Sequence, residues 1–189
     1  MKRSLFLALA ALLVIAPGAN SQGKGFFDFY TFKLGVGSGF PIAPDGFKDD
    51  WNPAFGLGFA VGAQKEMVEV AADFNFDFFV EDAGVELLPD DINVLTIFLT
   101  VKIKPIETRA RPYIMGGGGY YRFWSVSPDI YENMLGYTGG AGLEVELNKK
   151  QQLFLEGRYL VGRLRLRELG NEIANIETIS ARLGISWIF

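Results

Sequence analysis

The stretch Ser180-Ala-Arg-Leu-Gly-Ile-Ser-Trp-Ile-Phe189 decides the fold. Every second residue from Ala181 to Phe189 is apolar, and these residues share one face of a β-strand because successive side chains of a strand point to opposite faces. In water, such a strand would be a sticky, unpaired edge. In lipid, where every backbone polar group must be paired within the protein, the last strand can pair with the first. We therefore expect a barrel that closes on itself in a membrane.

The same alternation with period two runs through most of the chain. From Val68 to Phe78 the even-numbered residues are apolar, whereas Glu69, Asp73 and Asp77 are among the odd-numbered ones. No helix separates residues in this way. Counting such segments predicts an all-β fold, an eight-stranded antiparallel up-and-down transmembrane β-barrel. The predicted strands cover residues 30–36, 55–61, 68–78, 95–103, 113–123, 135–147, 153–161 and 176–189.

The alternation also assigns residues to the outer or the inner face. In the fifth strand it predicts Tyr113, Met115, Tyr121 and Phe123 outside and Arg122 inside. Glycines dominate the inner face of the first, second, fifth and sixth strands. The predicted inward glycines are Gly35, Gly37, Gly39, Gly56, Gly58, Gly62, Gly116, Gly118, Gly136, Gly140 and Gly142. A soluble barrel would expose Lys, Thr and Ser on this polar face, so the glycines favour the membrane barrel, whose crowded lumen suits small residues.

Short and long connections alternate between the predicted strands. The short ones cover residues 65–67, 105–111 and 148–152, and the long ones cover 41–53, 80–91, 125–134 and 164–175. Outer-membrane barrels have short periplasmic turns and long extracellular loops. We therefore expect both chain ends in the periplasm.

The first residues predict export. Lys2 and Arg3 precede an apolar run from Leu5 to Ile15, and Ala19 and Ser21 form a small-x-small cleavage site. The apolar run is shorter than the roughly 20 residues of a membrane-spanning helix. We therefore predict a signal peptide over residues 1–21 and a single barrel domain over residues 22–189.

Composition excludes several functions. The net charge is −4 and becomes more negative without Lys2 and Arg3, so nucleic acid is not an expected partner. The chain contains no cysteine and no histidine, which removes disulfides, Cys/His metal sites and the usual general base near neutral pH. Asp73 and Asp77 could form a carboxylate pair, but neighbouring inward carboxylates on one strand more often join ion pairs. We predict no enzyme activity, no cofactor and no metal.

In these features the chain resembles the small eight-stranded outer-membrane barrels of the OmpA-transmembrane and OmpX type. The resemblance rests on the predicted leader, the strands 111–122 and 139–147, and the terminal Trp187-Ile-Phe189. It implies a monomer in outer-membrane lipid and lipopolysaccharide that periplasmic chaperones and the barrel-assembly machinery deliver. It also implies that Trp187 and Phe189 act as the assembly signal. Enzymes on such barrels depend on a histidine, which this chain lacks.

Charged residues predicted inside the barrel nearly balance. They are Lys33, Lys102, Arg122, Arg158 and Arg182 against Glu69, Asp73, Asp77, Glu144, Glu146 and Glu156. Six of them fall at middle depth and are expected to form an ion-pair network, because an unpaired buried charge costs several kcal/mol. These six are Lys33, Asp73, Glu144, Glu156, Arg158 and Arg182. Two functions remain open: a closed structural or interaction barrel, and a narrow channel for small solutes through a slot left by the glycines.

The outer surface adds two expectations. Continuing the outward register beyond Tyr159 and Val161 places Arg163, Arg165 and Arg167 at the extracellular rim, where guanidinium groups would bind lipopolysaccharide phosphates. A solvated strand end, or a bulge that turns these arginines toward the loop carboxylates, is the alternative. The long loops are acidic, and solvated charge is expected there rather than calcium, because the spacing matches no calcium loop. These loop residues are Asp45, Asp49, Asp50, Glu81, Asp82, Glu86, Asp90, Asp91, Asp129 and Glu132.

Overall fold

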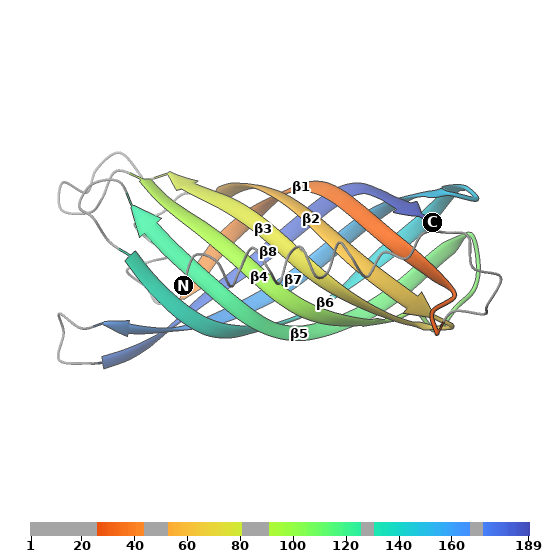
Figure 1. Cartoon of the computed structure of the whole chain (residues 1–189). Coiled ribbons are helices and arrows are strands. Elements are labelled where there is room, and N and C mark those ends of the chain that lie inside the picture. The colour runs from red at the N-terminus through yellow and green to blue at the C-terminus, as the bar shows by residue number, and fades with distance from the viewer. Residues whose placement is uncertain (1–25, 44–52, 81–90, 126–130, 167–171) are drawn as a thin grey trace.

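The protein is an antiparallel β-barrel. The computed structural model describes residues 26–43, 53–80, 91–125, 131–166 and 172–189, and within them it contains eight strands. They are β1 (Phe29–Ala43), β2 (Ala54–Lys65), β3 (Val68–Val80), β4 (Asp91–Ile103), β5 (Ala110–Ser125), β6 (Tyr131–Asn148), β7 (Gln151–Leu166) and β8 (Glu172–Ile188). Each strand pairs with its neighbours in chain order, and β8 pairs with β1 (Figure 1). The predicted fold class is confirmed. Among the described residues no helix is long and apolar enough to cross a membrane.

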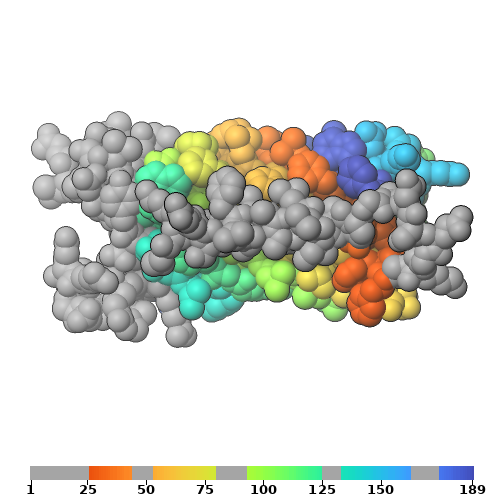
Figure 2. Space-filling view, viewed as in Figure 1, coloured from red at the N-terminus to blue at the C-terminus, as the bar shows by residue number. Residues whose placement is uncertain are grey.

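The seam between β1 and β8 closes the barrel. Gly35 lies opposite Gly184 in the register of these strands. At the end of the seam the Tyr30 amide donates to the Phe189 carbonyl at 3.2 Å, and the Phe189 amide donates to the Tyr30 carbonyl at 3.0 Å. The space-filling view shows side chains of β1 and β8 side by side along this seam (Figure 2). The final strand therefore has no free edge over this stretch, as its sequence predicts.

The outer face of the barrel is apolar. Leu34 and Val36 of β1, Leu57 of β2, Leu99 of β4 and Leu183 of β8 are all exposed. Aromatic rings join this surface across strands, with centroid distances of 5.8 Å between Phe32 and Trp187 and 4.7 Å between Phe59 and Phe74. A soluble barrel would bury such residues and expose polar ones. The arrangement is that of a barrel whose outer wall faces lipid.

In β5 the inner and outer faces are exchanged relative to the prediction. The side chains predicted to face outward are buried in the barrel, and Arg122, predicted to face inward, is exposed. The misassigned inward residues are Tyr113, Met115, Tyr121 and Phe123. Both faces of this strand carry apolar residues, because Ile114 and Tyr120 lie on the other side, so alternation alone could not choose between the faces.

Lumen contacts explain the facing of β5. The Tyr113 hydroxyl donates to Glu156 at 2.7 Å, and the Tyr121 ring meets the Phe98 ring edge-on at 5.1 Å. The reversal also moves the glycines. Gly116 and Gly118 lie on the outer face, and Gly117 and Gly119 replace them on the inner face. The remaining predicted inward glycines lie on the inner face.

The two ends of the barrel differ in their connections. The short turns cover residues 66–67, 104–109 and 149–150, all at one end, where β8 also finishes (Figure 1). Glu66 has a φ of 52°, in the left-handed region that tight turns often use, and its amide donates to the Asp28 carboxylate at 2.7 Å. We call this the short-turn end, and the opposite end the long-connection end.

Candidate functional site: the lumen of the barrel

Four charged side chains alternate in sign near the short-turn end. Lys33 Nζ lies 2.9 Å from Glu69 and 2.6 Å from Glu144. Lys104 Nζ contacts the same two carboxylates at 2.5 Å and 2.7 Å. All four side chains are at most 3% exposed. This short-turn cluster pairs each charge twice, which is the condition under which ionised groups remain in a dry interior.

Neutral side chains complete the short-turn cluster. The Thr31 hydroxyl donates to Glu69 at 3.0 Å, and Lys104 Nζ donates to Gln64 Oε1 at 2.8 Å. Both neutral residues point inward from the first strands of the barrel and are buried. Charge-assisted hydrogen bonds of this kind add to the ion pairs of Glu69 and Lys104.

A central cluster, formed by Asp73, Lys102, Glu156, Arg158 and Arg182, lies next along the lumen. Arg158 contacts Asp73 at 2.7 Å and also pairs with Glu156. Lys102 Nζ lies 2.8 Å from Glu156. These pairs connect β3, β4 and β7, so they brace opposite walls of the barrel. Buried pairs that join distant strands hold those strands together only while both partners are present.

Arg182 is the least tightly paired cation of the central cluster. Its Nη1 lies 3.7 Å from both Asp73 and Glu156. Asp77, two residues beyond Asn75 on β3, makes no ion pair within 4.0 Å among the described residues. The central cluster therefore ends in one loosely held cation and one nearby carboxylate.

Tyr113 joins the two clusters. Its ring centroid lies 5.9 Å from Lys33 Nζ and 5.1 Å from Lys102 Nζ, while its hydroxyl donates to Glu156. Cations over an aromatic face within about 6 Å are attracted by the ring quadrupole. The inward facing of β5 thus links the short-turn cluster to the central cluster.

The structure divides the six residues predicted to form one lumen network between the two clusters. Lys33 and Glu144 lie in the short-turn cluster, and the other four lie in the central cluster. Sequence reasoning listed Glu69 and Lys102 as inward but not as members of the network, and it missed Lys104 and Tyr113. Lys104 follows the last predicted residue of its strand and precedes Pro105, and its even number continues the inward series through Lys102. The even number of Lys104 was therefore the signal in the sequence that could have placed its side chain inside the barrel.

Other predicted charges lie elsewhere. Arg122 is exposed on the outer face, so its predicted inward position is wrong. Glu146 is only partly buried and lies 3.4 Å from Arg111 near the short-turn end. Both of these residues stand outside the two clusters.

Several predicted residues fall at or beyond the limits of the described chain. The backbones of Arg163 and Arg165 continue β7 and pair with Asn175 and Ile173, but their side chains lie outside the described residues, as does Arg167. The acidic loop residues and the predicted signal peptide also lie outside them, except that the backbones of Asp91 and Glu132 belong to β4 and β6. Val161, predicted to face outward like Tyr159, is buried.

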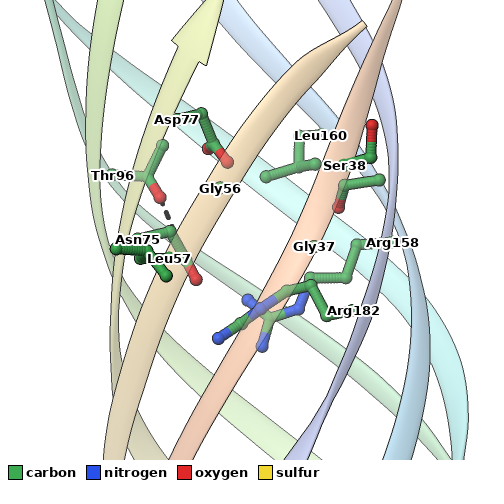
Figure 3. A pocket seen from close by; sticks show the side chains of 11 residues that line it. Gly37, Ser38, Gly56, Leu57, Asn75, Asp77, Thr96, Arg158, Leu160 and Arg182 are labelled. Atoms are coloured by element: carbon green, nitrogen blue, oxygen red, sulfur yellow. Dashed lines mark hydrogen bonds between the residues drawn. The ribbon is translucent and has the colours of Figure 1, made fainter.

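Two small cavities of about 20 Å³ each lie in the lumen beyond the central cluster. Both are lined by Asp77, Thr96, Leu160 and Ser180. Figure 3 shows Arg158 and Arg182 together at one side of the first cavity and Asp77 at the other. Each cavity has room for about one water molecule. Neither cavity is large enough for a solute.

No group of acidic residues in the described part of the chain is placed to hold a metal ion. The lumen carboxylates contact lysine and arginine side chains instead. The chemistry available to these groups is charge pairing and hydrogen bonding.

Comparison with known proteins identifies the fold. No family model matches the chain, and no curated protein does. Neisserial surface protein A has a similar structure, with a TM-score of 0.66 and 11% identity over 85% of this chain and 97% of that chain. The outer-membrane protein OprG from Pseudomonas aeruginosa aligns with a TM-score of 0.57 and 15% identity over 85% and 95% of the two chains.

A third solved structure is Ail, the attachment invasion locus protein of Yersinia pestis, in complex with the heparin analogue sucrose octasulfate. It aligns with a TM-score of 0.54 and 17% identity over 85% of this chain and 98% of that chain. Such identities show a shared fold alone. The chain has the fold of small eight-stranded outer-membrane barrels, and the resemblance predicted from the sequence is confirmed at that level.

Proposed function

We propose that this protein is an integral outer-membrane barrel with a closed lumen, which acts as a structural or interaction protein of the cell envelope. The observation that carries the proposal is the set of buried ion pairs across the lumen. Lys33, Lys104, Glu69 and Glu144 fill the cross-section near one end, and Arg158 spans the next level through Asp73 and Glu156. Eight-stranded barrels have interiors just wide enough for side chains to fill.

The filled cross-section supports a closed barrel over a channel. A hydrated ion would have to displace side chains that are each paired with an opposite charge, and the cavities beyond them hold about one water each. Breaking one such pair leaves an uncompensated buried charge, at a cost of about 3–5 kcal/mol. A narrow channel for small solutes is the alternative that a direct measurement would reveal.

Conductance in a planar lipid bilayer tests this proposal. The purified, folded protein is added at rising concentration, and heat-dependent mobility on SDS gels verifies folding of the same sample. We expect no stable conductance steps above the bare bilayer. Reproducible steps whose frequency rises with folded protein, and disappears with boiled protein, would replace the closed barrel by the channel.

The location and orientation of the protein in the cell envelope are part of the same proposal. The predicted leader over residues 1–21 would direct export, and the short-turn end would face the periplasm together with both ends of the mature chain. Periplasmic chaperones and the barrel-assembly machinery are the proposed partners in assembly, and the mature protein is proposed to be a monomer. The absence of histidine and cysteine favours a protein without enzyme activity.

Lipopolysaccharide is the proposed ligand of the outer rim. Arg163, Arg165 and Arg167 alternate with leucines in the sequence. The backbones of Arg163 and Arg165 lie at the long-connection end of β7, and the exposed Arg122 approaches the same end on β5. Arginine binds phosphate through paired hydrogen bonds. The Ail barrel, similar in fold, has been solved with a polysulfated sugar. The acidic long loops would lie beyond this rim, and their partner is unassigned.

A further inference from the structure

A ring of apolar side chains crosses the lumen near the long-connection end. Its members come from β2 to β8 and are at most 8% exposed. They are Ala54, Phe79, Val94, Phe98, Tyr121, Phe123, Met134, Leu160 and Ile176. We call this set the apolar ring. Most of its members lie nearer the long-connection end than the ion-pair clusters do, whereas Phe98 pairs with Asp73 in the register of β3 and β4 and lies next to the central cluster.

The apolar ring closes around the whole circumference. The first strand contributes Gly39, where an added Cβ would lie 3.7 Å from the Phe79 ring and 3.8 Å from the Ala54 side chain. Tyr121 lies between two other rings, with centroids 5.1 Å from Phe98 and 6.1 Å from Phe123. The Phe79 ring therefore lies beside the glycine on β1, and only a cavity of about 20 Å³ remains among Gly39, Phe79, Tyr121 and Phe123.

A polar chamber lies between the apolar ring and the central cluster. Three buried polar atoms line its first cavity without a hydrogen-bond partner among the described residues, namely Asn75 Oδ1, Arg158 Nη1 and Ser180 Oγ. Buried polar groups in folded proteins are nearly always paired with protein or ordered water. The cavity is large enough for about one water molecule, which would satisfy these atoms. Figure 3 shows the chamber between Asp77 and the two arginines.

We propose that the lumen is sealed twice, by ion pairs toward the short-turn end and by the apolar ring toward the long-connection end, with a hydrated chamber between the two seals. The inference rests on the proposed closed barrel. Apolar constrictions block water and ions because a narrow apolar passage loses its water. The two seals act by opposite chemistry, so opening one leaves the other intact.

Cysteine labelling in the chamber tests the apolar seal directly, because the chain contains no cysteine. Ser180→Cys places a thiol of similar size in the wall that both cavities share. Folded protein in detergent micelles, with both ends open to solution, is treated with iodoacetamide, and labelling is followed by mass spectrometry. The same reaction is repeated with a variant that also carries Phe79→Ala and Phe123→Ala, which remove two aromatic side chains from the apolar ring.

We expect the ring substitutions to speed labelling of Ser180→Cys by about tenfold or more, because they open a wetted path to the chamber. The matched control replaces the outward Phe55 and Phe78 by Ala, which removes two aromatic rings from the lipid face and should leave labelling slow. A second thiol, Ser186→Cys, lies opposite Lys33 in the barrel wall on the far side of the central cluster. The labelling rate of Ser186→Cys should not change when Phe79→Ala and Phe123→Ala are added.

The outcomes separate this inference from the proposed function. Rapid labelling of Ser180→Cys with the ring intact, or equal labelling with and without the ring, would overturn the apolar seal. A parallel increase at Ser186→Cys would also overturn it, because that result indicates general loosening. The ring variant should still show no bilayer conductance, since the ion pairs remain. Conductance of the parent protein would defeat the closed barrel itself.

If the double ring variant fails to fold, as heat-dependent mobility on SDS gels would show, Phe123→Ala alone with Ser180→Cys gives the same comparison. We then expect a smaller but measurable increase in labelling rate over the parent. An unchanged rate in this folded single variant would count against the seal.

Discussion

Arg158 Nη2 lies 2.7 Å from Asp73 Oδ1, across the lumen between β7 and β3, although 85 residues separate the two in the chain. Three strands lie between β3 and β7 in the barrel order, so the ion pair joins opposite walls. Glycines make room for the neighbouring arginine, since a Cβ at Gly37 or Gly58 would overlap the Arg182 side chain. The interior is thus built from long charged side chains that cross space vacated by residues without side chains.

The first prediction concerns Arg158→Ala. The substitution removes the close cation of Asp73, whose other cation Arg182 lies 3.7 Å away, and one of the two close cations of Glu156. We therefore expect a loss of about 3–5 kcal/mol in the free energy of unfolding. Urea titration in lipid vesicles, followed by gel mobility, measures it. Arg109→Ala removes an exposed arginine near the short turns and should change stability by less than about 1 kcal/mol. Equal midpoints for the two variants would show that the central cluster does not stabilise the barrel.

A double-mutant cycle tests the short-turn cluster. Lys104→Met and Glu144→Gln each break the 2.7 Å pair between these side chains and leave the short-turn cluster with one unbalanced charge. The double variant removes both charges, so its loss of stability should be smaller than the sum of the two single losses. We expect a coupling of about 0.5–3 kcal/mol. Strict additivity in the same urea assay would mean that Lys104 and Glu144 act independently.

The sequence predicts the barrel better than its interior. Along β3, apolar even-numbered residues and charged odd-numbered residues specify both faces, so strand and facing follow directly. Along β5 the glycines Gly116 to Gly119 carry no side chains, and apolar residues flank them on both faces. Facing there depends on partners from other strands, such as Glu156 for Tyr113, which no local pattern reveals.

The apolar ring escaped prediction for a similar reason. Leu160 and Met134 sit at inward positions near the ends of their strands, where long connections interrupt the alternation. Their common height becomes visible only when the stagger of the strands around the barrel is known. Residues of one ring are thus scattered through the sequence.

Paired glycine substitutions test the packing of the wall. A Cβ on the inward Gly119 would overlap the Ile97 carbonyl oxygen, whereas nothing lies within 4 Å of a Cβ on the outward Gly157. We expect Gly119→Ala to destabilise the barrel by about 1–3 kcal/mol. Gly157→Ala should be neutral or stabilising by about 0.4–1 kcal/mol, because it restricts the unfolded chain. Urea midpoints that move together for the two variants would contradict this account.

The chain end offers a test of assembly. Phe189 exchanges two backbone hydrogen bonds with Tyr30, and its side chain is exposed. Phe189→Asp retains the backbone bonds but removes the aromatic signal. We expect lower levels of folded protein in the outer membrane, with refolding in detergent little changed. Phe55→Asp is the matched control, an outward phenylalanine far from the chain end. Normal membrane levels of Phe189→Asp would refute a role of this residue in assembly.

The last prediction concerns lipopolysaccharide at the outer rim. Replacing Arg163, Arg165 and Arg167 together by Gln removes three guanidinium groups, whose charge-assisted hydrogen bonds contribute about 1.5–3 kcal/mol each before desolvation and salt reduce them. A ligand that binds only the folded state stabilises it. Added lipopolysaccharide should therefore raise the unfolding midpoint of the parent, more at low salt than at high salt, and raise that of the triple variant much less. Arg109→Gln, at the opposite end of the barrel, should respond like the parent, and adding Arg122→Gln to the triple variant should reduce the response further. If parent and triple variant respond equally at low and high salt, these arginines form a solvated strand end and do not bind lipid phosphate.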